Sequence, residues 1–180
     1  KKVAILGYGV NNAELGPFLL KRGANVTICD KNTELPQDLD GVTYRLGDAY
    51  LENLDGFDYL FRTPALPYLA PELQKAQASG AILTSQTQLF LEECPAHTIG
   101  VTGTKGKGTT ATLIFKSLEA AAEKGVIKGK AYLAGNIGTS PIQYLDSLTP
   151  DDWIVLELSS FQLHGLTVSP HIAVALTIGS

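Results

Sequence analysis

The residues with the clearest chemical potential form one glycine-rich segment near the middle of the chain: Gly103, Thr104, Lys105, Gly106, Lys107, Gly108, Thr109 and Thr110. This segment follows an apolar run at residues 97–102 and precedes a helical pattern from about residue 109 to residue 123. A strand, a glycine turn and a helix in this order form an anion site, because consecutive backbone N–H groups point into one concavity and the helix N-terminus adds partial positive charge. The segment therefore predicts an ATP-binding phosphate loop in which Lys107 reaches the β- and γ-phosphates.

The residue after Lys107 departs from the common phosphate-loop pattern. That pattern places a Ser or Thr hydroxyl after the lysine, where it binds Mg²⁺, and this chain has Gly108 instead. We expect either that Thr109 supplies the hydroxyl through a shifted backbone, or that Mg²⁺ relies more on carboxylates and water. The alternative is a glycine turn that binds no ligand, which the lysines and threonines gathered at the start of a helix disfavour.

An acid at the end of a second apolar run supports the phosphate loop. Glu157 lies near the C-terminal end of the run at residues 153–158. Ligands of open α/β sheets bind at that end of the strands, and a carboxylate there can hold Mg²⁺ beside the phosphates. We therefore predict Lys107 and Glu157 as catalytic residues, and Glu157 and Thr109 as metal ligands. The alternative for Glu157 is a structural acid at a strand end.

A second glycine turn lies near the N-terminus, at residues 7–12 (Gly-Tyr-Gly-Val-Asn-Asn). It begins like a dinucleotide-binding fingerprint, but Asn12 replaces the third glycine. Asp30, at the end of the next apolar run, lies where an acid would meet a ribose hydroxyl. Three interpretations stay open: a nicotinamide dehydrogenase, a site for a uridine-like nucleotide and its diphosphate, and a Rossmann-like fold without nucleotide.

The pattern of apolar runs and helical stretches sets the expected fold. Strands are predicted near residues 3–6, 25–30, 42–46, 59–61, 81–83, 97–102, 131–133, 153–158 and 172–178, and helices near residues 13–22, 71–79 and 109–123. Alternating strands and helices favour parallel sheets covered on both faces. We predict the α/β class, with a Rossmann-like domain at residues 1–94 and the truncated first part of a P-loop ATPase domain at residues 95–180.

Composition excludes several classes of protein. The net charge of −4 gives no basic surface for nucleic acid, and the apolar runs are far shorter than the roughly 20 residues of a membrane span. Cys29 and Cys94 fit thiols in a reducing cytoplasm, and the three histidines are too scattered along the sequence to suggest a metal site. The chain has no methionine and stops after a strand-like run, so we expect a piece of a longer protein.

Three segments together resemble the Mur ligase family. Residues 100–107 resemble its ATP motif, and residues 134–138 resemble its Gly-Asn-Ile-Gly turn. Residues 156–163 (Leu-Glu-Leu-Ser-Ser-Phe-Gln-Leu) resemble the segment typical of the D-glutamate-adding branch. The order and spacing of these segments agree along essentially the whole chain.

The resemblance implies an ATP- and Mg²⁺-dependent ligase of peptidoglycan synthesis, which joins D-glutamate to UDP-N-acetylmuramoyl-L-alanine through an acyl phosphate. Such enzymes have three domains, and this chain would hold the UDP-binding first domain and the opening part of the ATP-binding second. We expect a cytoplasmic monomer with no nucleic-acid or membrane partner. The chain alone is expected to be inactive, because the amino-acid-binding third domain is absent.

Residue roles follow from the same resemblance. Asn136, Ser159 and Gln162 would face the muramoyl-alanine part of the substrate. Near the diphosphate and the nucleotide, the family positions correspond to Thr63, Pro64 and Asn11. The chain departs from the family pattern at Ala65, where glycine is usual, and at residues 31–32, where Lys-Asn replaces a Thr-Arg pair that can hold the uracil.

Two alternatives to this function stay open. One is another ligase of the same superfamily, of the folylpolyglutamate type, which a comparison of UDP-sugar and folate acceptors would separate. The other is a non-catalytic nucleotide-binding module, which would bind nucleotide without turnover.

Overall fold

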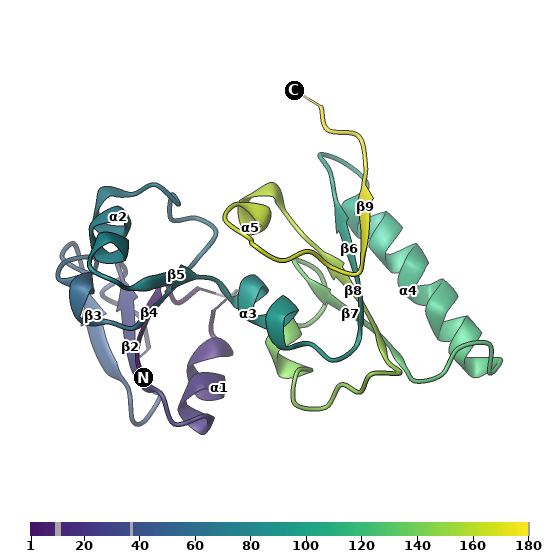
Figure 1. Ribbon diagram of the computed structural model, residues 1–180, viewed down its shortest axis with the longest axis horizontal. Coiled ribbons are helices and arrows are strands. Elements are labelled where there is room, and N and C mark those ends of the chain that lie inside the picture. The colour runs from purple at the N-terminus through teal and green to yellow at the C-terminus, as the bar shows by residue number, and fades with distance from the viewer. Residues whose placement is uncertain (10–11, 37, 180) are drawn as a thin grey trace. The chain divides into compact units, whose positions relative to one another are not determined.

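The computed structural model describes residues 1–9, 12–36 and 38–179, which form two compact units, Lys1–Gln86 and Thr87–Ser180 (Figure 1). Helix α3 (Gln86–Glu93) is held in the second unit, because the Gln88 side chain donates to the Thr167 hydroxyl and accepts from the Thr167 N–H. The unit boundary therefore lies directly after the first residue of α3, whereas the domain boundary inferred from the sequence lies after residue 94. The functional division at that residue stays a prediction.

The first unit is built on a five-stranded parallel sheet in the order β3-β2-β1-β4-β5. Its elements are β1 (Lys2–Leu6), α1 (Leu15–Lys21), β2 (Asn25–Asp30), β3 (Thr43–Leu46), the 3₁₀ turn η1 (Leu54–Gly56), β4 (Tyr59–Arg62), α2 (Pro71–Ala78) and β5 (Ile82–Thr84). Figure 1 shows α1 and α2 on opposite faces of this sheet. Because both faces are covered, the central strand β1 is buried from Val3 to Leu6.

The second unit contains a four-stranded parallel sheet in the order β7-β8-β6-β9. Its remaining elements are β6 (His97–Thr102), α4 (Lys107–Glu123), β7 (Ala131–Gly135), the 3₁₀ turn η2 (Pro141–Gln143), β8 (Trp153–Glu157), α5 (Ser160–Leu163) and β9 (Ile172–Ala175). Helix α4 packs its buried Ala111 against Ile99, Val101 and Val155 of the sheet. The glycine segment that precedes α4 is thereby fixed at the carboxyl end of β6.

The α/β class predicted from the sequence is confirmed by these parallel sheets. Several elements differ in extent from the expectation; for example, α4 begins at Lys107 rather than near residue 109, and β9 ends at Ala175 rather than near residue 178. Helices α3 and α5 were not expected. Within the described residues, no helix combines the length and the hydropathy of a transmembrane segment.

Candidate functional site

The glycine loop between β6 and α4 takes a shape that only glycines accommodate easily. Gly103 has a φ of 140°, and a Cβ there would lie 2.7 Å from the Cβ of Leu176. Gly106, the N-cap of α4, has a φ of 81° in the left-handed region. Both positions therefore favour glycine because of their positive φ. Gly103 also requires it because any side chain there would collide with Leu176.

The loop is also tied to the segment that follows β9. The N–H of Thr104 donates to the carbonyl of Thr177 at 3.0 Å, and the hydroxyl of Thr104 accepts from the N–H of Gly179 at 3.0 Å. A cleft of about 550 Å³ lies here, lined by Thr104, Lys105, Leu176, Thr177 and Gly179. This cleft places open space directly beside the loop that the sequence predicts to bind phosphates.

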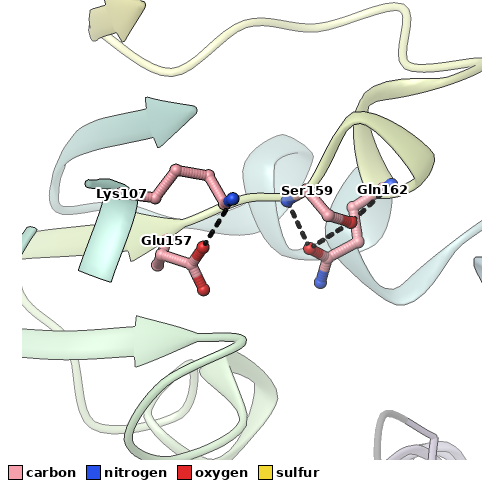
Figure 2. Close-up of polar contacts among 4 residues, drawn as sticks. All are labelled: Lys107, Glu157, Ser159 and Gln162. Carbon is pink, nitrogen blue, oxygen red and sulfur yellow. Dashed lines mark hydrogen bonds and ion pairs between the residues drawn. The ribbon is translucent and has the colours of Figure 1, made fainter. Parts of the chain in front are cut away.

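Lys107 and Glu157 face each other at the carboxyl edge of the second sheet (Figure 2). Lys107 is the first residue of α4 and Glu157 the last residue of β8, in register with Val101 of β6. The ammonium and carboxylate lie 3.9 Å apart, and their side chains are 22% and 6% exposed. At this distance the two groups form an ion pair, but they are too far apart for a hydrogen bond. The two charges are thus next to the glycine loop without being locked to each other.

The turn after β7 fixes the backbone of Glu157. Gly135 has a φ of 107°, and a Cβ there would lie 2.2 Å from the carbonyl oxygen of Glu157. That oxygen accepts the N–H of Asn136 at 3.0 Å. Gly135 was not among the site residues inferred from the sequence, although its place directly before Asn136 was a signal for it. The structure therefore brings Asn136, whose side chain is exposed, to the same sheet edge as Glu157.

Ser159 and Gln162 form a reciprocal cap on the short helix α5 (Figure 2). The Gln162 N–H donates to the Ser159 hydroxyl at 3.2 Å, and the Gln162 carbonyl Oε1 accepts from the Ser159 N–H at 2.9 Å. Such a capping box satisfies donors that the first turn of a helix otherwise leaves without partners. Both side chains thus have a local structural role, and contact with substrate stays a prediction.

The metal ligands proposed from the sequence, Glu157 and Thr109, supply one carboxylate and one exposed hydroxyl. Residues 1–9, 12–36 and 38–179 contain no cluster of three or more His, Cys, Asp and Glu side chains able to hold a metal. Oxygen ligands suit Mg²⁺, which keeps several waters and takes the rest from phosphates and one or two carboxylates. The residues present therefore fit a Mg²⁺ that arrives with a nucleotide, rather than an all-protein metal cage.

Two of the three histidines, His97 and His171, are close together in space although they are far apart in the sequence. His97 and His171 have ring centroids 6.0 Å apart, and His97 stacks on Trp153 with centroids 4.5 Å apart. His97 begins β6 and His171 precedes β9, so this cluster lies at the amino ends of the strands, away from the glycine loop.

In the first unit, two turns meet at the point where the strand order reverses. Strands β1 and β4 are neighbours, and the sheet extends from them in opposite directions, which is where open α/β sheets bind ligands. Gly7 has a φ of 87°, and a Cβ there would lie 2.5 Å from Cγ2 of Thr63. The turn with Thr63 and the half-buried Pro64 therefore packs directly on the glycine turn. Asn11, predicted to contact the nucleotide, lies outside the described residues.

Asp30 and Asn12 hold this glycine turn from two sides. The Asp30 carboxylate accepts the N–H of Tyr8 at 2.6 Å and that of Asn32 at 2.8 Å. Asn12, which is 2% exposed, donates from Nδ2 to the carbonyl of Gly7 at 2.8 Å. Each Asp30 oxygen has a backbone donor, which gives the carboxylate a structural role in this turn. A ribose contact stays a prediction, since each oxygen keeps a second lone pair.

Comparison with known proteins finds relatives that are named as ligases. It is 42% identical over 185 residues to UDP-N-acetylmuramoylalanine–D-glutamate ligase of Acetivibrio thermocellus and 44% identical over 185 residues to that of Ruminiclostridium cellulolyticum, matches that cover 99% of this chain. The protein of the same name from Clostridium botulinum is 42% identical over 96% of the chain. The chain spans 38% of the length of these relatives. No protein-family model matches it.

A solved structure shares the fold. The UDP-N-acetylmuramate:L-alanyl-γ-D-glutamyl-meso-diaminopimelate ligase from Neisseria meningitides superposes with a TM-score of 0.54 at 21% identity, over 99% of this chain and 61% of that one. At this identity the likeness concerns the fold alone.

Proposed function

The chain belongs to the Mur ligase family, and on that premise we propose that it is part of an ATP-dependent amide ligase that adds D-glutamate to UDP-N-acetylmuramoyl-L-alanine. The observation that carries this proposal is the Lys107–Glu157 pair beside the glycine loop. Because the chain spans 38% of its relatives, the activity belongs to the longer protein that contains it.

In the proposed reaction, a carboxylate oxygen of the muramoyl-alanine attacks the γ-phosphorus of ATP, and ADP leaves. The amine of D-glutamate then attacks the carbonyl carbon of the acyl phosphate, and an amide bond forms as phosphate leaves and the amine loses a proton. Lys107 and the N-terminus of the 17-residue helix α4 would offset charge on the transferring phosphoryl group. Glu157 and Thr109 would hold Mg²⁺, which when bound neutralises phosphate charge.

The eight residues of the glycine loop, from Gly103 to Thr110, would bind the phosphates of ATP. Asn136, Ser159 and Gln162 would position the muramoyl-alanine carboxylate near the loop, since they follow β7 and β8 at its sheet edge. The turns of the first unit, with Asn11, Thr63 and Pro64, would bind the uridine diphosphate end. We further propose that residues 1–94 and 95–180 correspond to these two functions, and that the protein acts as a cytoplasmic monomer.

The test is phosphate release by the full-length protein that contains this chain. We expect release only when ATP, Mg²⁺, UDP-N-acetylmuramoyl-L-alanine and D-glutamate are all present, and a product one glutamyl residue heavier by mass spectrometry. Turnover with a folate acceptor in place of the UDP-sugar would instead support a folylpolyglutamate-type ligase. Binding of UDP and ATP by calorimetry without any turnover would support a non-catalytic module.

A further inference from the structure

Arg62 is a buried arginine at the carboxyl edge of the first sheet. It is the last residue of β4, in register with Leu6 of β1, and it is 4% exposed. Arginine is seldom buried to this extent unless its guanidinium makes specific contacts. Burial lowers the pKa of Arg62, but an arginine guanidinium stays charged at neutral pH. A buried positive charge therefore lies at the end of β4, where the strand order reverses between β1 and β4.

The guanidinium organises the turn that follows β4. Its Nη1 donates to three carbonyl oxygens, those of Thr63 at 3.2 Å, Pro64 at 3.3 Å and Leu66 at 2.6 Å. It also lies 5.7 Å from the ring centroid of Tyr68. Converging bonds from one buried group therefore hold three carbonyls of the turn toward the Arg62 side chain.

The direction of these carbonyls matters for an anionic ligand. Carbonyl oxygens carry partial negative charge, and oxygens that faced the crevice between β1 and β4 would repel a diphosphate. Because Arg62 binds the carbonyl oxygens of Thr63, Pro64 and Leu66, these oxygens are less available to repel an anion at the carboxyl ends of β1 and β4. The N–H of Thr63 donates to the carbonyl of Leu6 at 2.9 Å, which keeps the turn in place beside β1.

We propose that Arg62 is a positioning residue for the diphosphate of the nucleotide substrate: it binds the carbonyls of Thr63, Pro64 and Leu66 and so leaves the carboxyl ends of β1 and β4 receptive to anions. This inference rests on the proposed function, because that function brings a uridine diphosphate to the first unit. Arg62 acts through the turn and is not required to touch the ligand.

Arg45 offers a matched control in the same unit. It lies on the edge strand β3, donates to the carbonyl of Glu52 and lies 5.6 Å from the ring centroid of Phe57. Like Arg62, Arg45 donates a hydrogen bond to a loop carbonyl and lies near an aromatic ring. Unlike Arg62, it is not at the strand-order reversal.

The experiment measures binding of UDP and of uridine to the chain by isothermal titration calorimetry, for the wild type and for Arg62→Met, Arg62→Lys and Arg45→Met. For Arg62→Met we expect UDP affinity to fall about tenfold while uridine affinity changes less than about twofold, the scale of losing charge-assisted hydrogen bonds. Arg62→Lys keeps the charge without the planar fork and should give a smaller loss. Arg45→Met should leave both affinities unchanged.

The ratio of UDP to uridine affinity decides the outcome, since a merely destabilised fold lowers both affinities together. If Arg62→Met folds and keeps the wild-type ratio, the proposal for Arg62 is overturned. If Arg62→Met does not fold, the ratio for Arg62→Lys decides in the same way. A wild-type chain that binds neither UDP nor uridine would instead overturn the nucleotide role of the first unit, and the Arg62 proposal with it.

Discussion

Two acids end apolar parallel strands, Asp30 on β2 of the first unit and Glu157 on β8 of the second, and the two units use them differently. Asp30 accepts backbone N–H groups at 2.6 Å and 2.8 Å, and these bonds close the glycine turn after β1. Glu157 faces Lys107 at 3.9 Å, and its backbone carbonyl, not its carboxylate, holds the neighbouring turn.

The difference separates an acid that holds a turn from an acid that we propose acts in a site. Charge-assisted hydrogen bonds to backbone N–H groups are among the stronger ones, so the Asp30 carboxylate stabilises the folded turn. A buried ion pair gains little net stability, because desolvation offsets the attraction. The Lys107–Glu157 pair is therefore expected to contribute little to folding, which agrees with the proposal that the two charges bind a ligand.

The largest expected effect is on Lys107. In the full-length protein, Lys107→Ala should lower D-glutamate-dependent phosphate release by about a thousandfold or more, because it removes the cation nearest the transferring phosphoryl group. Lys116→Ala is the matched control, since Lys116 lies on the same helix and pairs with Glu119 at its exposed face. Unchanged turnover in Lys107→Ala would refute the catalytic role of the pair.

Glu157→Gln tests the second residue of the Lys107–Glu157 pair, and also the contrast between Glu157 and Asp30. Turnover should fall about a hundredfold, on the scale of losing one electrostatic contact in a transition state. The free energy of unfolding of the chain should change by less than about 1 kcal/mol, because the Glu157 carboxylate is beyond hydrogen-bond reach of its partner. Urea unfolding and phosphate release measure the two effects. A large loss of stability would make Glu157 a structural acid like Asp30.

Asp30→Asn should show the reverse pattern. The amide side chain has one acceptor where the carboxylate has two, so one backbone N–H loses its partner, and unfolding of the chain should become easier by about 1–3 kcal/mol. In the full-length protein kcat should change less than about threefold, since Asp30 holds a binding turn and no reacting group. Asp48→Asn is the control, because the Asp48 side chain is 97% exposed. Wild-type stability in Asp30→Asn would remove the contrast with Glu157.

The sequence alone did not distinguish these two acids. Both follow an apolar run, and this position predicts a ligand contact in each case, whereas the difference depends on which backbone N–H groups the folded turns bring near. The strands were predictable, because each is a short apolar run bounded by turn residues. The glycine loop was predictable too, because its backbone conformation restricts which residues can occupy it.

Other features depend on tertiary contacts that no local pattern records. Helix α3 is short and its apolar residues 89–91 are consecutive, so it shows no helical period, yet Phe90 is fully buried. Arg62 looks like a surface residue at a strand end, and only the fold of the following turn explains its burial. Ser159 and Gln162 were predicted as substrate contacts, and the structure adds the capping role that their spacing also allows.

The smallest expected effect concerns Gly108, where the phosphate-loop pattern would place a hydroxyl. A Cβ at this position would meet Ile137 at 3.8 Å, an ordinary van der Waals contact, whereas one at Gly103 would lie 2.7 Å from Leu176. Gly108→Ser should therefore fold, with a gain in stability of at most about 1 kcal/mol from helix propensity. If Mg²⁺ binds beside Glu157, the added hydroxyl should lower the Mg²⁺ concentration for half-maximal turnover by about two- to fivefold. Gly108→Ala separates the hydroxyl from the helix effect, and equal Mg²⁺ dependence in the two variants would place the metal away from residue 108. A shift in the serine variant alone would show that the metal beside Glu157 accepts a further oxygen ligand at residue 108.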